Sequence, residues 1–243
     1  MAGNSGFALR RAAWSIGAVL LLTTVAACTT GGKGTTTCGT PTPLHTGTPT
    51  TTGWWITTQL GGATVDVDNS YQAPTGFGCN AVVMTTGNSN TDHVQVLTYA
   101  KAGTSLASVT SLSYWTYRAA PADGAAPDIA LNVEVNGPPG PGFAPTCTSG
   151  TCFSTLVFEP YLQGGGNAAI HDGVWQHWDA INSGNGMWWS SKVGQGTMYS
   201  WAQIQSLYPG ATIGGYGPNL GSYNPNTVGA ADGLKFNATT TNF

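Results

Sequence analysis

The chain has 243 residues; 7% of them are charged, 41% are hydrophobic and 35 are glycine. Low charge together with many aromatic residues is typical of a compact β-rich domain, and it excludes an intrinsically disordered chain, in which charge is high and hydrophobicity is low. The formal net charge of −3 argues against nucleic acid as a partner, because binding to phosphates needs clustered Lys and Arg.

The first 27 residues have the pattern of an export signal. Arg10 and Arg11 precede an uncharged run, residues 12–27, which is shorter than the ~17 to 25 apolar residues of a membrane-spanning helix. The basic start, the short apolar core and the small residues at its end predict a secretory signal peptide over 1–27. Its removal leaves five basic residues against ten acidic ones, a net charge of −5.

The segment Val25-Ala26-Ala27-Cys28 resembles the lipobox of bacterial lipoproteins. The resemblance implies cleavage before Cys28, diacylation of its thiol, and attachment to the membrane through that lipid. Two acyl chains are enough for stable anchoring. Ordinary secretion is the alternative, because Val25-x-Ala27 also suits a common signal peptidase. The protein is therefore expected on the extracellular face of the cell membrane, or secreted.

Residues 28–52 form a spacer rich in Thr, Gly and Pro, with no apolar periodicity. This composition predicts a semi-extended tether. The remaining residues, 53–243, are enough for one domain with a sizeable hydrophobic core.

The five cysteines are an odd number, which in an exported protein points to one thiol with a separate role. Assigning Cys28 to the lipid leaves four, which allow three pairings. The short, turn-rich spacing between Cys147 and Cys152 favours a local disulfide, and Cys38–Cys79 is then the remaining pair. That second bond would close a loop of about 40 residues, worth ~4 kcal/mol in the chain-entropy model.

Alternation of period two dominates the domain. Apolar residues at 129, 131, 133 and 135 alternate with others at 130, 132, 134 and 136, the pattern of a half-buried strand. Similar runs occur at 64–67, 81–85, 93–100, 112–118, 155–162, 174–179, 212–217 and 233–236. Gly, Asn, Pro and Ser clusters separate them, so the predicted fold is all-β, a two-sheet antiparallel sandwich. One short helix is predicted near 200–208, because Ser200 and Gln203 form a capping-box pattern and Pro209-Gly210 ends it.

The domain resembles jelly-roll carbohydrate-binding domains. The resemblance rests on the W-x-x-W-like segment Trp175-Gln-His-Trp178, the late helical turn, and the closing strand Val228-Gly-Ala-Ala-Asp-Gly-Leu-Lys-Phe236. It implies a jelly-roll sandwich that binds sugars without catalysis, on a concave sheet face or at a loop edge. The implied partner is a polysaccharide or a cell-wall glycan, and some such domains hold a structural calcium.

A sugar ring offers apolar C–H faces and hydroxyl edges, so its site needs aromatic surfaces beside Asn, Gln, Glu or Arg. Candidate ligand-binding residues fall in groups along the predicted strands: Tyr114, Tyr117 and Arg118; Asn132 and Glu134; Glu159 and Tyr161; Trp175, His177 and Trp178; and Trp188. Alternation allows only one of Trp175 and Trp178 to face outward. A tryptophan in a sandwich is also more often a core anchor than a ligand platform.

Two other function classes remain open. Glu134 and Glu159 are the only glutamates, on strands that the loop 137–151 would make antiparallel neighbours. Directly opposed positions have Cβ atoms ~4.5 to 5.5 Å apart, close to the ~5 to 5.5 Å between the carboxyls of retaining glycosidases. A surface glycoside hydrolase is therefore the first alternative, although the E-x-D-x-x-E pattern of sandwich-fold glucanases is missing. The second is a structural or adhesive envelope protein that binds no small ligand.

No cofactor is expected, apart from a structural calcium that hard oxygen ligands could hold. Asp66 and Asp68 share one strand face, and Asp232 lies in the final strand. An Asp-Asn-Ser turn after the strand accounts for Asp68 equally well.

Overall fold

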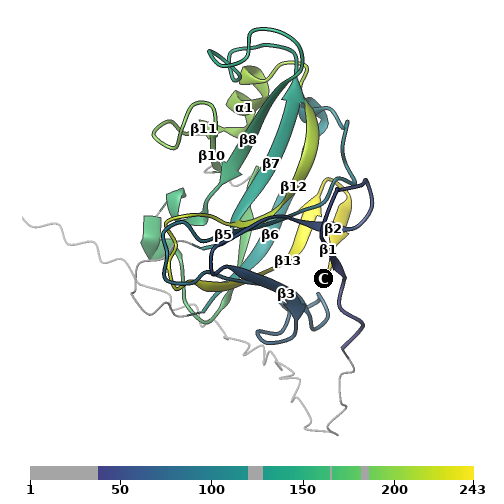
Figure 1. The fold of residues 1–243 in the computed structure, drawn as a ribbon, viewed down its shortest axis with the longest axis vertical. Helices are drawn as coiled ribbons and strands as arrows, with labels where there is room; N and C mark the ends of the chain where they lie inside the picture. Colours follow the sequence, from purple (N-terminus) through teal and green to yellow (C-terminus); the bar gives the residue numbers. More distant parts are fainter. Residues whose placement is uncertain (1–37, 120–127, 165, 182–185) are drawn as a thin grey trace, which may run out of the picture. The chain divides into compact units, whose positions relative to one another are not determined.

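The computed structural model describes residues 38–119, 128–164, 166–181 and 186–243. The predicted signal peptide, Cys28 and the start of the spacer lie outside the described residues. The described chain folds into two β-sheets (Figure 1). The strand pairs are antiparallel, except for the parallel pair β1–β2. The predicted all-β sandwich of two antiparallel sheets is therefore confirmed.

The larger sheet has the strand order β1-β2-β5-β12-β7-β8-β10-β11, and the smaller has the order β3-β4-β13-β6-β9, with β14 paired to β13. The strands of the larger sheet are β1 (Leu44–His45), β2 (Trp54–Leu60), β5 (His93–Leu97), β12 (Thr212–Leu220), β7 (Ala130–Gly137), β8 (Cys152–Phe158), β10 (Met187–Ser190) and β11 (Tyr199–Ser200). Those of the smaller are β3 (Thr64–Asp68), β4 (Ala81–Thr85), β13 (Val228–Phe236), β6 (Leu112–Arg118), β9 (Trp175–Asp179) and β14 (Thr239–Thr241). Helix α1 spans Trp201–Leu207, and short 3-10 helices span Leu106–Ser108, Pro160–Leu162 and Gly166–Ala169.

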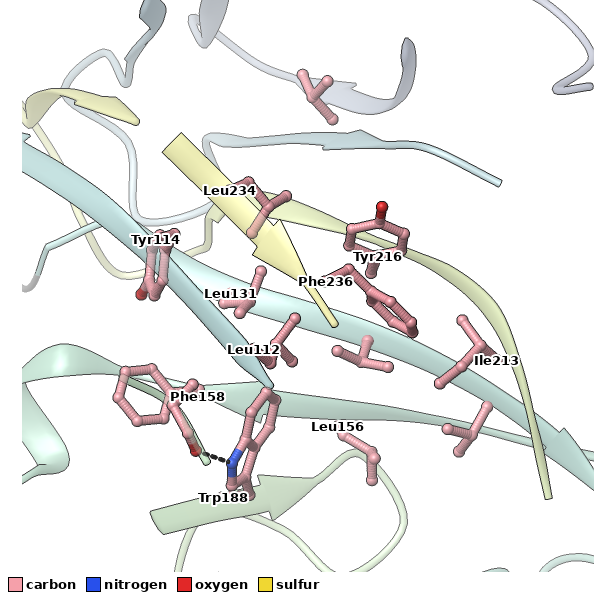
Figure 2. Packing of buried hydrophobic residues seen from close by; sticks show 14 of the residues in the cluster. Leu112, Tyr114, Leu131, Leu156, Phe158, Trp188, Ile213, Tyr216, Leu234 and Phe236 are labelled. Carbon is pink, nitrogen blue, oxygen red and sulfur yellow. Dashed lines mark hydrogen bonds between the residues drawn. The ribbon is translucent and has the colours of Figure 1, made fainter. Parts of the chain in front are cut away.

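The hydrophobic core lies between the two sheets (Figure 2). Leu131, Val133 and Val135 of β7 are fully buried in it, as their alternation predicts. Aromatic pairs join the sheets across the core. The ring centroids of Tyr114 in β6 and Phe158 in β8 are 6.2 Å apart, and those of Tyr216 in β12 and Phe236 in β13 are 4.7 Å apart. The outer faces of the sheets are therefore where a ligand can reach the protein.

Helix α1 begins at the predicted capping box. The Ser200 hydroxyl accepts a hydrogen bond from the backbone N–H of Gln203, and the Gln203 side chain accepts one from the N–H of Ser200. Trp201 and Ile204 are buried against the core. Pro209 and Gly210 follow the helix, and Gly210 has a positive φ of 71°, which suits a glycine that ends a helix. The predicted helix near 200–208 is confirmed.

Strand β8 is shorter at its end than the predicted strand 155–162. It stops at Phe158, and Pro160 begins a 3-10 helix. Proline has no N–H to donate to a neighbouring strand, so it ends the pairing there. Glu159 and Tyr161 consequently lie just beyond the strand.

The domain begins earlier than the sequence indicates. Both predicted disulfides, Cys38–Cys79 and Cys147–Cys152, are present. β1 pairs with β2, and the side-chain amide of Asn80 donates to the Gly39 carbonyl at 3.1 Å. The predicted spacer, 28–52, is thus attached to the sandwich from residue 38 onward. Within the described ranges, no helix is both long and apolar enough to cross a membrane.

Candidate functional site

A cavity of about 460 Å³ opens on the outer face of the larger sheet, and we call it the groove. Strands β5, β12, β7, β8 and β10, which are successive neighbours in that sheet, and the loops beyond them provide its lining (Figure 1). The lining residues are His93, Gln95, Asn132, Thr155, Val157, Glu159, Trp189, Ser191, Gln195, Asn219, Gly221, Ser222 and Tyr223. Most of them are uncharged and polar.

A chain of side-chain amides crosses the sheet under the groove. Asn132 Nδ2 donates to Gln95 Oε1 at 2.7 Å, and Gln95 Nε2 donates to Thr57 Oγ1 at 3.0 Å. These two bonds fix the orientation of the Asn132 amide. Its Oδ1 atom is buried and accepts no hydrogen bond from any described residue. A buried acceptor without a donor is costly, and because this atom is shielded from solvent, it is not counted among the ligand contacts of the groove.

Glu159 and Trp189 form one end of the groove. The Glu159 carboxylate accepts hydrogen bonds from Trp189 Nε1 and from Gln195 Nε2, both at 2.7 Å. Gln195 Nε2 also donates to the Tyr161 hydroxyl at 2.6 Å. Burial raises the pKa of Glu159, while the hydrogen bonds from Gln195, Trp189 and Tyr161 oppose the rise. The indole ring and the carboxylate are thereby held side by side.

Tyr223 stands at the opposite side of the lining, in the loop after β12. It is 79% exposed, the highest value among the large hydrophobic side chains that protrude from the described chain. Its φ is +66°, which is uncommon for a residue with a large side chain. The backbone N–H of Tyr223 donates to the Asn90 carbonyl at 2.8 Å and holds the loop in place. Such strained, exposed positions occur often at binding sites.

Four of the predicted ligand residues lie on or near the outer face of the larger sheet, where the groove opens. Asn132 and Glu159 line the groove, and Tyr161 contacts the groove through Gln195. Glu134 lies two residues from Asn132 on the same face of β7, where burial raises its pKa and a hydrogen bond from Tyr99 opposes the rise. The structure therefore places Asn132, Glu159 and Tyr161 at the groove, and Glu134 on the same sheet face outside its lining.

Glu134 and Glu159 do not form the close pair that retaining hydrolysis needs. In the β7–β8 hairpin Glu134 pairs with Thr155, not with Glu159. Glu159 is four residues further along the chain, which places the two backbone positions about 13 Å apart at ~3.3 Å per residue. The expectation that the two glutamates are directly opposed is wrong, because the register of the hairpin places Thr155 opposite Glu134.

Three predicted ligand residues point into the core instead. Tyr114 is 1% exposed, and its hydroxyl donates to the Ile129 carbonyl at 2.9 Å. Trp188 is fully buried. Trp178 pairs with Tyr114 and donates its indole N–H to Thr116 at 2.8 Å. Their prediction as ligand residues is wrong, because these three residues occupy inward-facing positions of β6, β9 and β10.

Tyr117, Trp175 and His177 lie on the outer face of the smaller sheet, away from the groove. The ring of Tyr117 is 4.8 Å from that of Tyr71 and 5.7 Å from that of Trp175. The indole N–H of Trp175 donates to the Gln72 carbonyl at 2.9 Å. These rings therefore hold the loop between β3 and β4 on the sheet. The ring of His177 packs against that of Trp115 in a tilted arrangement, with the centroids 5.0 Å apart, and burial lowers the pKa of His177.

Arg118 is buried at the end of β6 and forms an ion pair with Asp172. Near it, the Thr116 hydroxyl donates to the carboxylate of Asp128. Burial raises the pKa of Asp128 to about 6, although hydrogen bonds from Thr116 and Ile129 and the Arg118 charge oppose the rise. Arg118 thus serves this buried polar cluster and does not reach the groove.

The three aspartates considered for calcium are not gathered around one point. β3 carries Asp66 and Asp68, β13 carries Asp232, and β4 lies between these strands. Two strand spacings separate the backbones of β3 and β13 by about 10 Å, and Asp232 is fully buried whereas Asp66 is exposed. Asp68 accepts a hydrogen bond from the Ser70 N–H at 2.7 Å, as in an Asp-Asn-Ser turn. The part of the chain that the structure describes has no group of three or more metal-ligating side chains.

Several residues of the groove are not predicted from the sequence. His93 and Gln95 alternate with Val94 and Val96 in β5, so the outward pattern was available there. Trp189 is adjacent to Trp188 in a strand of four residues. So short a strand does not reveal which of the two tryptophans faces outward. Tyr223 lies in a loop, where no periodicity applies.

The groove can accept hydrogen bonds from hydroxyl groups and stack a ring against Trp189 or Tyr223. Carbohydrates present both kinds of surface. Comparison of the chain with protein-family models, curated proteins and solved structures finds no match. The function is therefore argued from the geometry of the groove.

Proposed function

We propose that this protein binds a glycan in the groove, without catalysis. The observation that carries the proposal is an indole ring held beside a fixed carboxylate, at Trp189 and Glu159, in one cavity that is otherwise lined mostly by uncharged polar side chains. Aromatic rings pack on the C–H faces of sugars, and directed polar groups bind the hydroxyls. The resemblance to jelly-roll carbohydrate-binding domains supports the same ligand class.

Trp189→Ala tests the proposal. Loss of the stacking surface is expected to weaken glycan binding about ten- to a hundredfold, equivalent to ~1.4 to 2.7 kcal/mol. The measurement is titration calorimetry with a glycan selected on an array by the wild-type protein. Circular dichroism checks that the variant is folded.

Trp175→Ala is the matched control, because Trp175 lies on the smaller sheet, where its indole N–H bonds to the backbone of the loop at Gln72. Its glycan affinity is expected to stay within about twofold of wild type, a change of ~0.4 kcal/mol. Equal affinity of Trp189→Ala and wild type, or a larger loss with Trp175→Ala, would show that the groove is not the site.

We also propose that the domain is displayed on the outer face of the membrane through lipid on Cys28. The two disulfides support an oxidising compartment. Mass spectrometry of the native protein is expected to find a diacylglycerol adduct on an N-terminal Cys28, and Cys28→Ser to appear in the medium. Membrane retention of Cys28→Ser would contradict the anchor.

A further inference from the structure

The charged side chain in the described lining of the groove is negative. The described lining contains the carboxylate of Glu159 and no lysine or arginine. Glu134 adds a second carboxylate on the same sheet face, two residues from Asn132. His93 lies with its Nε2 atom 2.7 Å from Asn219 Oδ1. An anionic ligand would therefore meet negative charge, with no lysine or arginine in the described lining to oppose it.

Uncharged polar side chains make up most of the rest of the lining. Thr155, Ser191 and Ser222 carry hydroxyls and Asn219 carries an amide, so the groove has groups that can donate to and accept from sugar hydroxyls. A sugar carboxylate or sulfate also brings a negative charge, and the described lining has no lysine or arginine to compensate for the hydration that this charge loses.

We propose that the groove selects neutral glycans over uronic-acid and sulfated glycans, and that Glu159 sets this selection. The inference rests on the proposed function and names the ligand class of the same site. The carboxylate is held beside the Trp189 ring by two hydrogen bonds. It cannot swing away from an anionic sugar without losing both hydrogen bonds. Charges a few ångströms apart at a partly exposed site repel enough to change affinity about three- to tenfold.

Pairs of glycans that differ in their charge test this selection. Cellohexaose, mannohexaose and galactohexaose are each compared with their C6-oxidised forms, which differ in carrying carboxylates, and a fully deacetylated chitosan hexamer supplies the opposite charge. The wild-type protein is expected to bind at least one neutral hexamer about tenfold or more tightly than its oxidised form. Raising the salt concentration should narrow this ratio, because salt screens exposed charges.

Glu159→Gln keeps the size of the side chain, and its amide oxygen can still accept from Trp189. In this variant the ratio of neutral to oxidised affinity is expected to fall about three- to tenfold. Asp66→Asn is the control, since it removes one negative charge from an exposed position in β3. The ratio in this control should equal that of wild type.

The possible failures are distinguishable. Tighter binding of an oxidised hexamer than of its neutral form, weaker binding of the chitosan hexamer than of an oxidised hexamer, or an unchanged ratio in Glu159→Gln would overturn the charge selection while leaving glycan binding in place. Absence of binding to every hexamer in the panel would overturn the proposed function, and the selection with it.

Discussion

Replacing Trp188 with alanine is expected to lower the free energy of unfolding by about 3 to 5 kcal/mol. Trp188 is fully buried, and its ring centroid lies 5.5 Å from that of Phe158 and 5.0 Å from that of Trp201. Its indole N–H donates to the Ala180 carbonyl at 2.8 Å (Figure 2). The substitution leaves both a cavity and an unpaired carbonyl, and the surrounding strands cannot close over them.

Urea denaturation, followed by circular dichroism, measures this loss from the shift of the midpoint. The neighbouring variant Trp189→Ala serves as the control, because that ring faces the groove. It should cost less than half as much stability while it weakens glycan binding. Equal stability losses in the two variants would contradict the assignment of the two tryptophans to opposite faces.

The stability of the protein is expected to fall as the pH rises from 5 to 8. Asp232 is fully buried, and burial raises its pKa to about 7, although hydrogen bonds from the Gly233 and Phe243 backbones oppose the rise. An unfolded Asp loses its proton near pH 4. Between about pH 4 and pH 7 the folded state therefore holds a proton that the unfolded state has lost, so raising the pH favours unfolding. Asp128, whose pKa is raised to about 6, acts in the same direction.

Asp232→Asn isolates the contribution of this group. Its amide oxygen can keep the hydrogen bond that Asp232 Oδ1 accepts from the Phe243 N–H. The free energy of unfolding of wild type, from urea curves at each pH, is expected to drop by about 2 to 4 kcal/mol between pH 5 and pH 8. The drop in the variant should be smaller by more than half. A gain in wild-type stability over this range, or the same change in stability with pH in the variant, would contradict a raised pKa of the buried Asp232.

Local patterns in the sequence are sufficient to predict much of the fold. The alternation at 129–136 identifies the inward residues of β7, and the capping box at Ser200 identifies the start of α1, because both signals depend on neighbours in the chain. The spacing of Cys147 and Cys152 likewise indicates their disulfide. These features need no knowledge of distant segments.

The candidate site depends on pairings between distant segments, which local patterns do not define. Asn132 and Trp175 both occur on predicted strands, yet they belong to different sheets. The register of β7 and β8 places Glu134 opposite Thr155, a choice set by the loop between the strands. The sequence therefore suggested aromatic and polar candidates, and tertiary pairing decided which of them share the groove.

If the chain is held through the proposed lipid on Cys28, the Cys38–Cys79 bond has a mechanical consequence. Tension arriving along the chain would reach Cys38 first and pass through the covalent link to Cys79, next to β4. β4 lies inside the smaller sheet, between β3 and β13. The two-residue pairing of β1 with β2 would bear little of the load, so a pull would not peel that edge strand away or disturb the groove.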